Sequence, residues 1–169
     1  KLGERGQQAM AVHGRMPAVA QKAAQDIGRT LEEAVKAGQI RLDDLFDHNY
    51  VPIPNTRPQK YSSNFDALTD NIFPPVQEPV LDGHKEAAYA GAVDINGYFP
   101  THNKRFSRPL TGDEKVDFVN NRTKRIFNDP VGKKCGSHEQ PYLLQTYRRD
   151  TGEIMHDLSV PIYVQGRHW

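Results

Sequence analysis

The segment AAYAGAVDINGYFPTH (87–102) decides the fold class, because it carries the strongest turn signal in the chain. Its Asn-Gly pair lies between two runs rich in apolar residues, a pattern typical of a tight β-hairpin. We therefore predict two antiparallel strands here. Pro100 cannot donate a backbone hydrogen bond, so it places the second strand at a sheet edge.

Beyond this hairpin the chain alternates between helix and strand patterns. Apolar spacings of three and four predict a helix over 113–127, which the run Asp129-Pro130-Val131-Gly132 ends. Strands are predicted over 142–149 and 153–164. A tight turn at Asp150-Thr151-Gly152 joins them.

The chain begins with a helical pattern. An Ala-rich apolar stripe predicts a helix over 15–37, with Gly38 as its C-terminal stop. All aromatic residues lie at Phe46 or beyond, so the packed body follows this helix. We therefore divide the chain into an N-terminal helix, 1–42, and a domain over 43–169. The helix either docks on that domain or is a signalling helix that pairs with a partner chain, and in the second case we expect a homodimer through helices.

Prolines set the pattern between this helix and the hairpin. Pro58 is predicted to open a second helix, with Tyr61 and Phe65 on its apolar face. Pro74-Pro75 is predicted to interrupt that helix, and residues 76–81 are predicted to form another turn.

Together these elements predict the α+β class, with an antiparallel sheet after N-terminal helices. Two hairpins separated by a helical segment suggest a PAS-like arrangement. A sheet of that kind has its last strand in the middle, and Arg167-His168-Trp169 supplies only its start. We therefore expect the last strand to be truncated. The chain also begins at Lys1 without an initiator methionine, so we expect a piece of a longer protein.

Composition excludes several classes of function. Twenty-two basic residues against 21 acidic ones give a net charge of +1, which argues against a nucleic-acid binder. No apolar run approaches the roughly 20 residues that span a bilayer, so we expect no membrane insertion. Cys135 is the single cysteine, which rules out an intrachain disulfide and favours a reducing compartment.

Four motifs carry a family resemblance: DINGYFPTHN (94–103), NRTKRIFND (121–129), LQTYRRD (144–150) and LSVPI (158–162). They resemble the sensor domain of a group of bacterial methyl-accepting chemotaxis proteins, and the resemblance covers about 31–169. It implies a PAS- or Cache-like sensory domain. Such a domain binds a small molecule and transmits the signal to a signalling coiled coil outside this fragment.

The resemblance also bears on location. Domains of this kind belong to receptors that are associated with the bacterial inner membrane or are soluble. They occur on both sides of that membrane. We expect a cytoplasmic domain, with a periplasmic placement as the alternative.

The most functional-looking segment runs from His102 to Arg125 and is rich in lysine and arginine. The planar guanidinium group matches carboxylate and phosphate oxygens, so a cavity beside this segment would suit an anion. Asn121, Arg122 and Arg125 are the predicted anchors, and Asn121 and Arg125 share a helix face. The alternative is an ordinary basic helix face in solvent.

Further candidates come from the predicted strands. Tyr98 and His102 are four residues apart, so both point to one face of a strand, where hydroxyl and imidazole suit a ligand. The alternative is a core tyrosine and a satisfied histidine. Tyr147 and His156 lie on the next two strands and are weaker candidates.

Metal binding and catalysis have little support in the sequence. The histidines form no close pair or Cys/His cluster, and neither a haem attachment motif nor a catalytic motif is present. Ser137, His138 and Glu139 are adjacent, but adjacency in sequence does not make a triad. We therefore expect a sensory domain that is not an enzyme and has no cofactor. The alternatives are a ligand-free dimerisation or structural module, a haem sensor in which a lone histidine would hold the iron, and a redox sensor that would use Cys135.

Overall fold

The structure is a computed structural model that describes residues 14–148 and 152–169. Its helices are α2 (Met16–Lys36), α3 (Leu42–Leu45), α4 (Asp66–Ile72), α5 (Pro74–Asp82), α6 (Glu114–Asn120) and α7 (Pro130–Ser137), with a 3-10 turn at Lys104–Phe106. Its strands are β1 (Val51–Pro52), β2 (Tyr61–Ser62), β3 (Tyr98–Phe99), β4 (Arg125–Ile126), β5 (Leu143–Arg148), β6 (Ile154–Ser159), β7 (Tyr163–Val164) and β8 (Arg167–His168). This mixture of helices and small sheets belongs to the α+β class.

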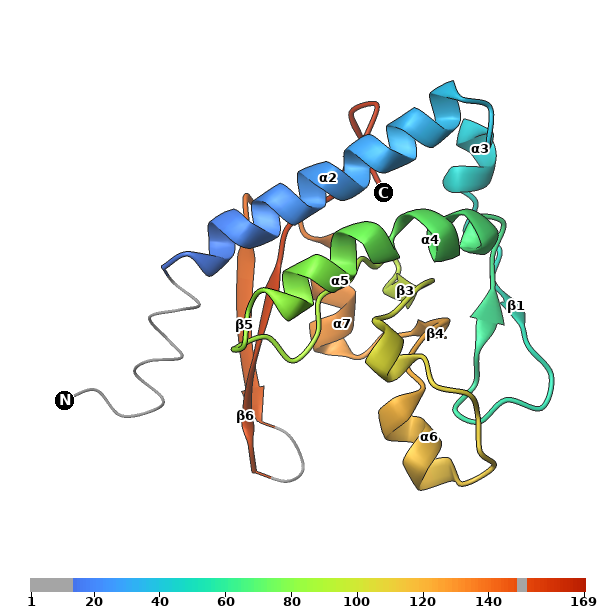
Figure 1. Cartoon of the computed structure of the whole chain (residues 1–169), viewed down its shortest axis with the longest axis vertical. Coiled ribbons are helices and arrows are strands. Elements are labelled where there is room, and N and C mark those ends of the chain that lie inside the picture. Colours follow the sequence, from blue (N-terminus) through green and yellow to red (C-terminus); the bar gives the residue numbers. More distant parts are fainter. Residues whose placement is uncertain (1–13, 149–151) are drawn as a thin grey trace.

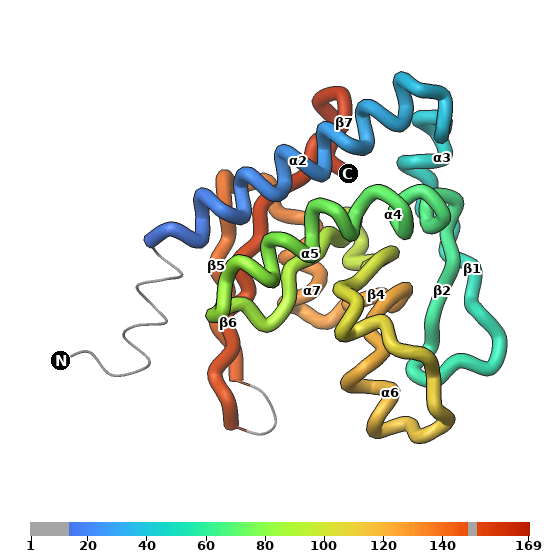
Figure 2. Tube along the Cα trace, in the orientation of Figure 1, coloured from blue at the N-terminus to red at the C-terminus, as the bar shows by residue number. Residues whose placement is uncertain are grey.

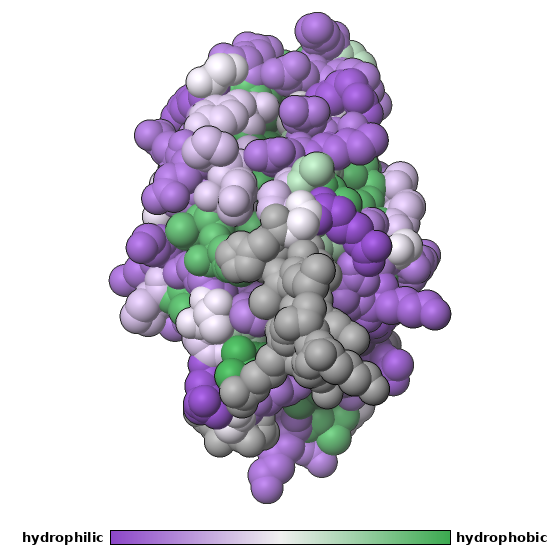
Figure 3. Space-filling model, turned by 90° about the vertical axis from the view of Figure 1, so that its left-hand side faces the viewer, coloured by the Kyte–Doolittle hydropathy of each residue, from purple (hydrophilic) through white to green (hydrophobic). Residues whose placement is uncertain are grey.

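Helices α2, α4 and α5 lie together at one end of the molecule (Figure 1). Helix α2 crosses one end above α4 and α5, whereas β5–β6 and α6 extend from the other end (Figure 1). The turn between β7 and β8 lies beside the middle of α2, far from it in sequence (Figure 2). The face at the left of Figure 1 is mostly hydrophilic, with separate hydrophobic patches (Figure 3).

The N-terminal helix is confirmed and packs on the rest of the chain. Ile27, Leu31 and Ala34 of α2 are buried. At Gly28 a Cβ atom would lie 2.7 Å from the carbonyl oxygen of Tyr163, so only glycine allows this close approach to β7. The buried face of α2 is therefore docked on its own domain.

The single antiparallel sheet expected from the sequence does not form in the described part of the chain. The strands pair as four separate two-stranded sheets, β1–β2, β3–β4, β5–β6 and β7–β8. The expected first strand, 87–95, is irregular because side chains bind its backbone: Ala90 N donates to Asn103 Oδ1, and Ala92 N donates to Gln77 Oε1, both at 2.9 Å. Instead of this segment, β4 pairs with β3.

The C-terminal hairpin was predicted more accurately. Strand β5 lies within the predicted 142–149. The predicted strand over 153–164 is divided into β6 and β7, with Pro161 in the gap, where it breaks the ladder. Asp150 and Thr151 of the predicted turn lie outside the described residues. The last strand, β8, begins at Arg167 as predicted.

Several predicted helix boundaries are wrong. The helix expected over 113–127 stops at Asn120, because Asn121 is extended (φ −129°, ψ 93°). The helix expected from Pro58 begins at Asp66 instead, since Tyr61–Ser62 forms β2. Pro74-Pro75 and Pro130 do not break helices but begin them, because the first helical turn needs no donor from proline.

Trp169 is at the centre of the core. It is 1% exposed, and its ring packs edge-on against Phe65 and Phe73, with centroids 5.5 and 5.7 Å away. Its Nε1 donates to the carbonyl of Leu45 at 3.1 Å. The same buried cluster includes Leu31 of α2 and Tyr98 of β3, so one core connects the N-terminal helix to the predicted site region.

Candidate functional site

Three of the predicted site residues belong to one cluster. His102, Arg122 and Arg125 lie among four phenylalanines, and together they make a closed circuit of ring contacts. We call this circuit the aromatic–arginine ring. Its successive contacts, measured between ring centroids or from guanidinium Cζ to centroid, are His102–Phe106 5.2 Å, Phe106–Arg122 5.8 Å, Arg122–Phe118 5.9 Å, Phe118–Arg125 4.8 Å, Arg125–Phe127 4.9 Å, Phe127–Phe99 6.0 Å and Phe99–His102 4.0 Å.

Aromatic faces hold both guanidinium groups in place. Arg125 lies between the rings of Phe118 and Phe127, and Arg122 lies between those of Phe106 and Phe118. Cation–π contacts of this length are attractive and restrict the side chain. Burial, and then the charge of Arg122, lower the pKa of Arg125 to about 10, well above neutral pH. The ring therefore presents fixed positive charge.

His102 adds a neutral donor to the ring. Its side chain is buried and stacks on Phe99. The backbone N–H of Asn103 donates to His102 Nδ1 at 2.8 Å, so the ring proton of the neutral imidazole is on Nε2. Burial, and then the charges of Arg122 and Arg125, lower the pKa of His102 to about 3. His102 is therefore uncharged at neutral pH.

Lys60 extends the positive region inward, and no motif or periodicity in the sequence marks it. This lysine is 7% exposed, and its Nζ donates to Asn121 Oδ1 and, at 2.9 Å, to the carbonyl of Thr123. Burial, and then the charges of Lys124 and Arg125, lower the pKa of Lys60 to about 8. No periodicity marks Lys60, since it follows a proline-rich connector and reaches Asn121 only through the fold.

Lys60 and Arg125 have no carboxylate partner among the residues that the structure describes. There, no Asp or Glu oxygen lies within 4 Å of Lys60 Nζ or the Arg125 guanidinium, whereas Lys124 forms an ion pair with Asp70 at 3.0 Å. A buried charge without a partner is costly, because its lost hydration is not replaced. The arrangement suits an anion with several acceptor oxygens.

Asn121 and Tyr98 bind to the protein itself. Asn121 is 6% exposed, accepts from Lys60 and donates to the carbonyl of Arg108 at 2.6 Å. Tyr98 is fully buried, and its hydroxyl donates to the carboxylate of Asp66 at 2.8 Å. Asn121 therefore positions Lys60, and the hydroxyl of Tyr98 is engaged in the core.

Tyr147 and His156 lie on the β5–β6 hairpin, and no contact joins them to the ring. Tyr147 is opposite Met155 in the register, and His156 is opposite Thr146, whose Oγ1 lies 2.9 Å from His156 Nδ1. Since residues directly opposite share a face, Tyr147 and His156 point to different faces of the hairpin. The structure does not bring them together with the other candidates.

A second, partly buried cluster contains Cys135. Burial, and then the charge of Asp157, raise the pKa of its thiol to about 12, so the thiolate that redox chemistry needs is disfavoured. Asp157 accepts from the hydroxyl of Tyr89 at 2.9 Å. The neighbouring His138 Nε2 bonds Ser159 Oγ at 2.9 Å and not Ser137, so the Ser-His-Glu sequence forms no triad.

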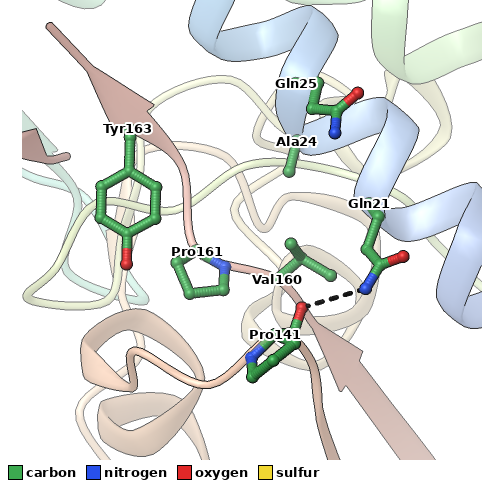
Figure 4. Close-up of a pocket in the computed structure, with 7 residues that line it drawn as sticks. All are labelled: Gln21, Ala24, Gln25, Pro141, Val160, Pro161 and Tyr163. Carbon is green, nitrogen blue, oxygen red and sulfur yellow. Dashed lines mark hydrogen bonds between the residues drawn. The ribbon is translucent and has the colours of Figure 1, made fainter. Parts of the chain in front are cut away.

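Two surface grooves lie along α2. One, of about 450 Å³, is lined by Gln21, Ala24, Gln25, Pro141, Val160, Pro161 and Tyr163 (Figure 4). The other, of about 440 Å³, lies between α2 and α5. None of the predicted site residues lines either groove, which differs from the expectation of a cavity beside the 102–125 segment.

Within 14–148 and 152–169, no group of three or more His, Cys, Asp or Glu side chains is arranged to hold a metal ion. No helix in these ranges is both long enough and apolar enough to cross a bilayer. Comparison with known proteins gave no match to a family model, a curated protein or a solved structure.

Proposed function

We propose that this chain is a sensory domain that binds a small anion at the aromatic–arginine ring. One observation carries the proposal: the buried ammonium group of Lys60 and the guanidinium group of Arg125, which lies between two phenylalanine rings, have no carboxylate partner among the described residues. A bound carboxylate or phosphate group would supply the missing negative charge. Rings that hold the guanidinium groups in advance reduce the entropy lost on binding.

The resemblance to chemotaxis receptors supplies the biological setting of this proposal. In that setting the domain has a PAS- or Cache-like ancestry, is part of a larger receptor and lies in the cytoplasm. The solvent-facing side of α2 would then pair with a second copy or pass the signal to a coiled coil. No catalytic step is part of this proposal.

A packed route connects the ring to α2. Phe99 of the ring is next to Tyr98 on β3, and Tyr98 packs against Phe65, which contacts Trp169. The same core includes Leu31 of α2. An anion that binds one arrangement of this core more tightly than another would shift the position of α2 by that difference in affinity.

A thermal-shift experiment tests the proposal. The protein is melted in acetate, succinate, phosphate and benzoate, each compared with chloride at matched ionic strength. An anion at ten times its Kd adds about 1.4 kcal/mol to the free energy of unfolding and raises Tm by roughly 3–6 °C. We expect at least one of these anions to do so.

Two variants locate the effect, and a third serves as the control. Arg125→Gln and Lys60→Met should abolish the shift, and their unliganded Tm and circular dichroism show whether they fold. Lys134→Gln removes an exposed charge on α7 and should leave the shift unchanged. An equal shift in Arg125→Gln, or no shift with any anion in the wild type, would contradict the proposal. If light scattering then showed a dimer, the ligand-free module would be the better account.

A further inference from the structure

The end of the molecule that carries α6 exposes an unusual number of apolar side chains. Leu110, Val116, Phe118 and Val119 are 40%, 40%, 53% and 49% exposed. They are half of the large hydrophobic side chains that are exposed in the described residues, and they lie within ten positions of one another. We call these four residues the α6 tip. Isolated exposed apolar residues are ordinary, but a cluster of them indicates a contact surface.

The tip is a projection and not a groove. Helix α6 and the loop before it extend away from the body at the end opposite α2 (Figures 1 and 2). The two grooves described above lie along α2. A peptide or helix partner normally needs a concave surface, whereas a projecting apolar tip can enter a flat, deformable one.

Exposed cations surround the tip. Lys104, Arg105, Arg108 and Lys115 are all exposed. Within the described ranges, no carboxylate oxygen lies within 4 Å of a side-chain nitrogen of any of them, although the backbone N–H of Lys104 donates to Glu78 Oε1 at 2.9 Å. The acidic residue at the centre of this region, Asp117, is 3% exposed.

The acidic side chains nearby form no ion pair with these cations within the described residues. Asp117 directs its carboxylate to the backbone of Thr111 and Gly112, at 2.9–3.1 Å. Asp113 caps α6 by accepting from Lys115 N at 3.0 Å. Glu114 is the remaining exposed acid on the helix. Residues 104–119 hold four basic and three acidic side chains, so this segment carries a net charge of +1, with its four cations outside any ion pair among the described residues.

We propose that the α6 tip docks peripherally on an anionic lipid surface. Val116, Val119 and Leu110 would enter the interfacial region, and the surrounding lysines and arginines would lie at the level of the headgroups. Each basic residue close to an anionic bilayer strengthens binding by about fivefold. Only Phe118 is shared with the aromatic–arginine ring, so this inference does not depend on the proposed anion site.

Vesicle sedimentation tests the proposal with the whole chain. The protein is mixed with phosphatidylcholine vesicles that contain phosphatidylserine, and separately with pure phosphatidylcholine vesicles. We expect binding to the first and little to the second, with a loss of binding at high salt. The double variant Val116→Ser/Val119→Ser should bind about tenfold more weakly, because the apolar contribution is lost. Arg105→Gln/Arg108→Gln should weaken binding by a similar or larger factor.

Matched controls lie elsewhere on the surface. Val51→Ser removes a valine that is 52% exposed on β1, and Lys133→Gln/Lys134→Gln removes two exposed charges from α7. Both should bind like the wild type. The proposal is overturned if anionic vesicles do not bind the protein, or if the tip variants bind as well as the controls. It is also overturned if Val116→Ser/Val119→Ser instead converts a dimer to a monomer in light scattering, since a second copy would then cover the tip.

Discussion

Two buried polar regions lie on either side of β3, and they differ in charge balance. On one side the carboxylates of Asp66 and Asp94 accept hydrogen bonds from the hydroxyls of Tyr98 and Tyr50. On the other side Lys60 and Arg125 carry positive charge, and neither has a carboxylate partner among the described residues.

In the carboxylate region, both carboxylates accept several hydrogen bonds. Asp94 is fully buried and accepts from Tyr50 and from the backbone N–H groups of Asn96 and Tyr98, at 2.9 and 3.0 Å. Asp66 accepts from Ser63 N and Oγ as well as from Tyr98. The buried donors and carboxylates of this region are thus paired with one another, and this network stabilises the fold.

The cationic region differs, because its charged groups Lys60 and Arg125 have no partner of opposite charge among the described residues. Lys60 donates to two neutral oxygens. Arg125 packs against two phenylalanine rings and donates to the carbonyl of Phe118. The comparison shows that buried polar groups in one small domain can differ in whether their charge is compensated within the protein. The satisfied carboxylate network is structural, whereas the cations Lys60 and Arg125 are the basis of the anion site that we propose.

The largest effect is expected at the centre of the carboxylate region. Asp94→Ala leaves the Tyr50 hydroxyl and two backbone N–H groups without an acceptor. We expect a loss of roughly 3–5 kcal/mol in the free energy of unfolding, measured by urea denaturation. Asp43→Ala, at an exposed position, should cost less than about 0.5 kcal/mol. A loss at Asp94 as small as at Asp43 would mean that the network is not structural.

The next largest effect is a pH dependence of the free energy of unfolding that arises from Lys60 in the cationic region. The pKa of Lys60 is lowered from 10.5 to about 8 by burial, so between these values the folded state holds fewer protons than the unfolded state. Stability should therefore rise as pH increases through this window, by up to about 3 kcal/mol.

Lys60→Met is the matched variant for this pH dependence. It carries no titrating group, so its stability profile should be flatter than the wild type from pH 8 toward 10. Urea denaturation at several pH values measures both profiles. Parallel profiles would show that Lys60 does not bear an unbalanced charge.

The smallest effect concerns one hydroxyl. Tyr98→Phe keeps the packing against Phe65 and removes the donor to Asp66, so we expect a loss of about 1–2 kcal/mol. Tyr142→Phe, at an exposed tyrosine, should change stability little. If Tyr98→Phe were neutral, the Asp66 network would be less complete than its geometry indicates.

The sequence predicted part of the site for a physical reason. Arg122, Arg125 and His102 stand out by residue type, because side chains that bind anions are few and chemically distinct. Phe106 and Phe118 did not stand out, since aromatic residues are usually core. Lys60 is far away in sequence and reaches Asn121 only across the fold. The hydroxyl of Tyr98 makes it a candidate in the sequence, but the structure shows that this hydroxyl donates to Asp66.

Local rules determined the elements whose signal lies within a few residues. The α2 helix, its stop at Gly38 (φ +75°) and the β5–β6 hairpin were set by periodicity and turn chemistry, and these depend only on neighbouring side chains. The tertiary structure decided which segments pair. Residues 87–95 have the composition of a strand, but Gln77 and Asn103 bind their backbone first, and β4 takes the place beside β3. Partners that are distant in the chain compete for the same backbone groups, and only the folded arrangement determines which of them is within reach.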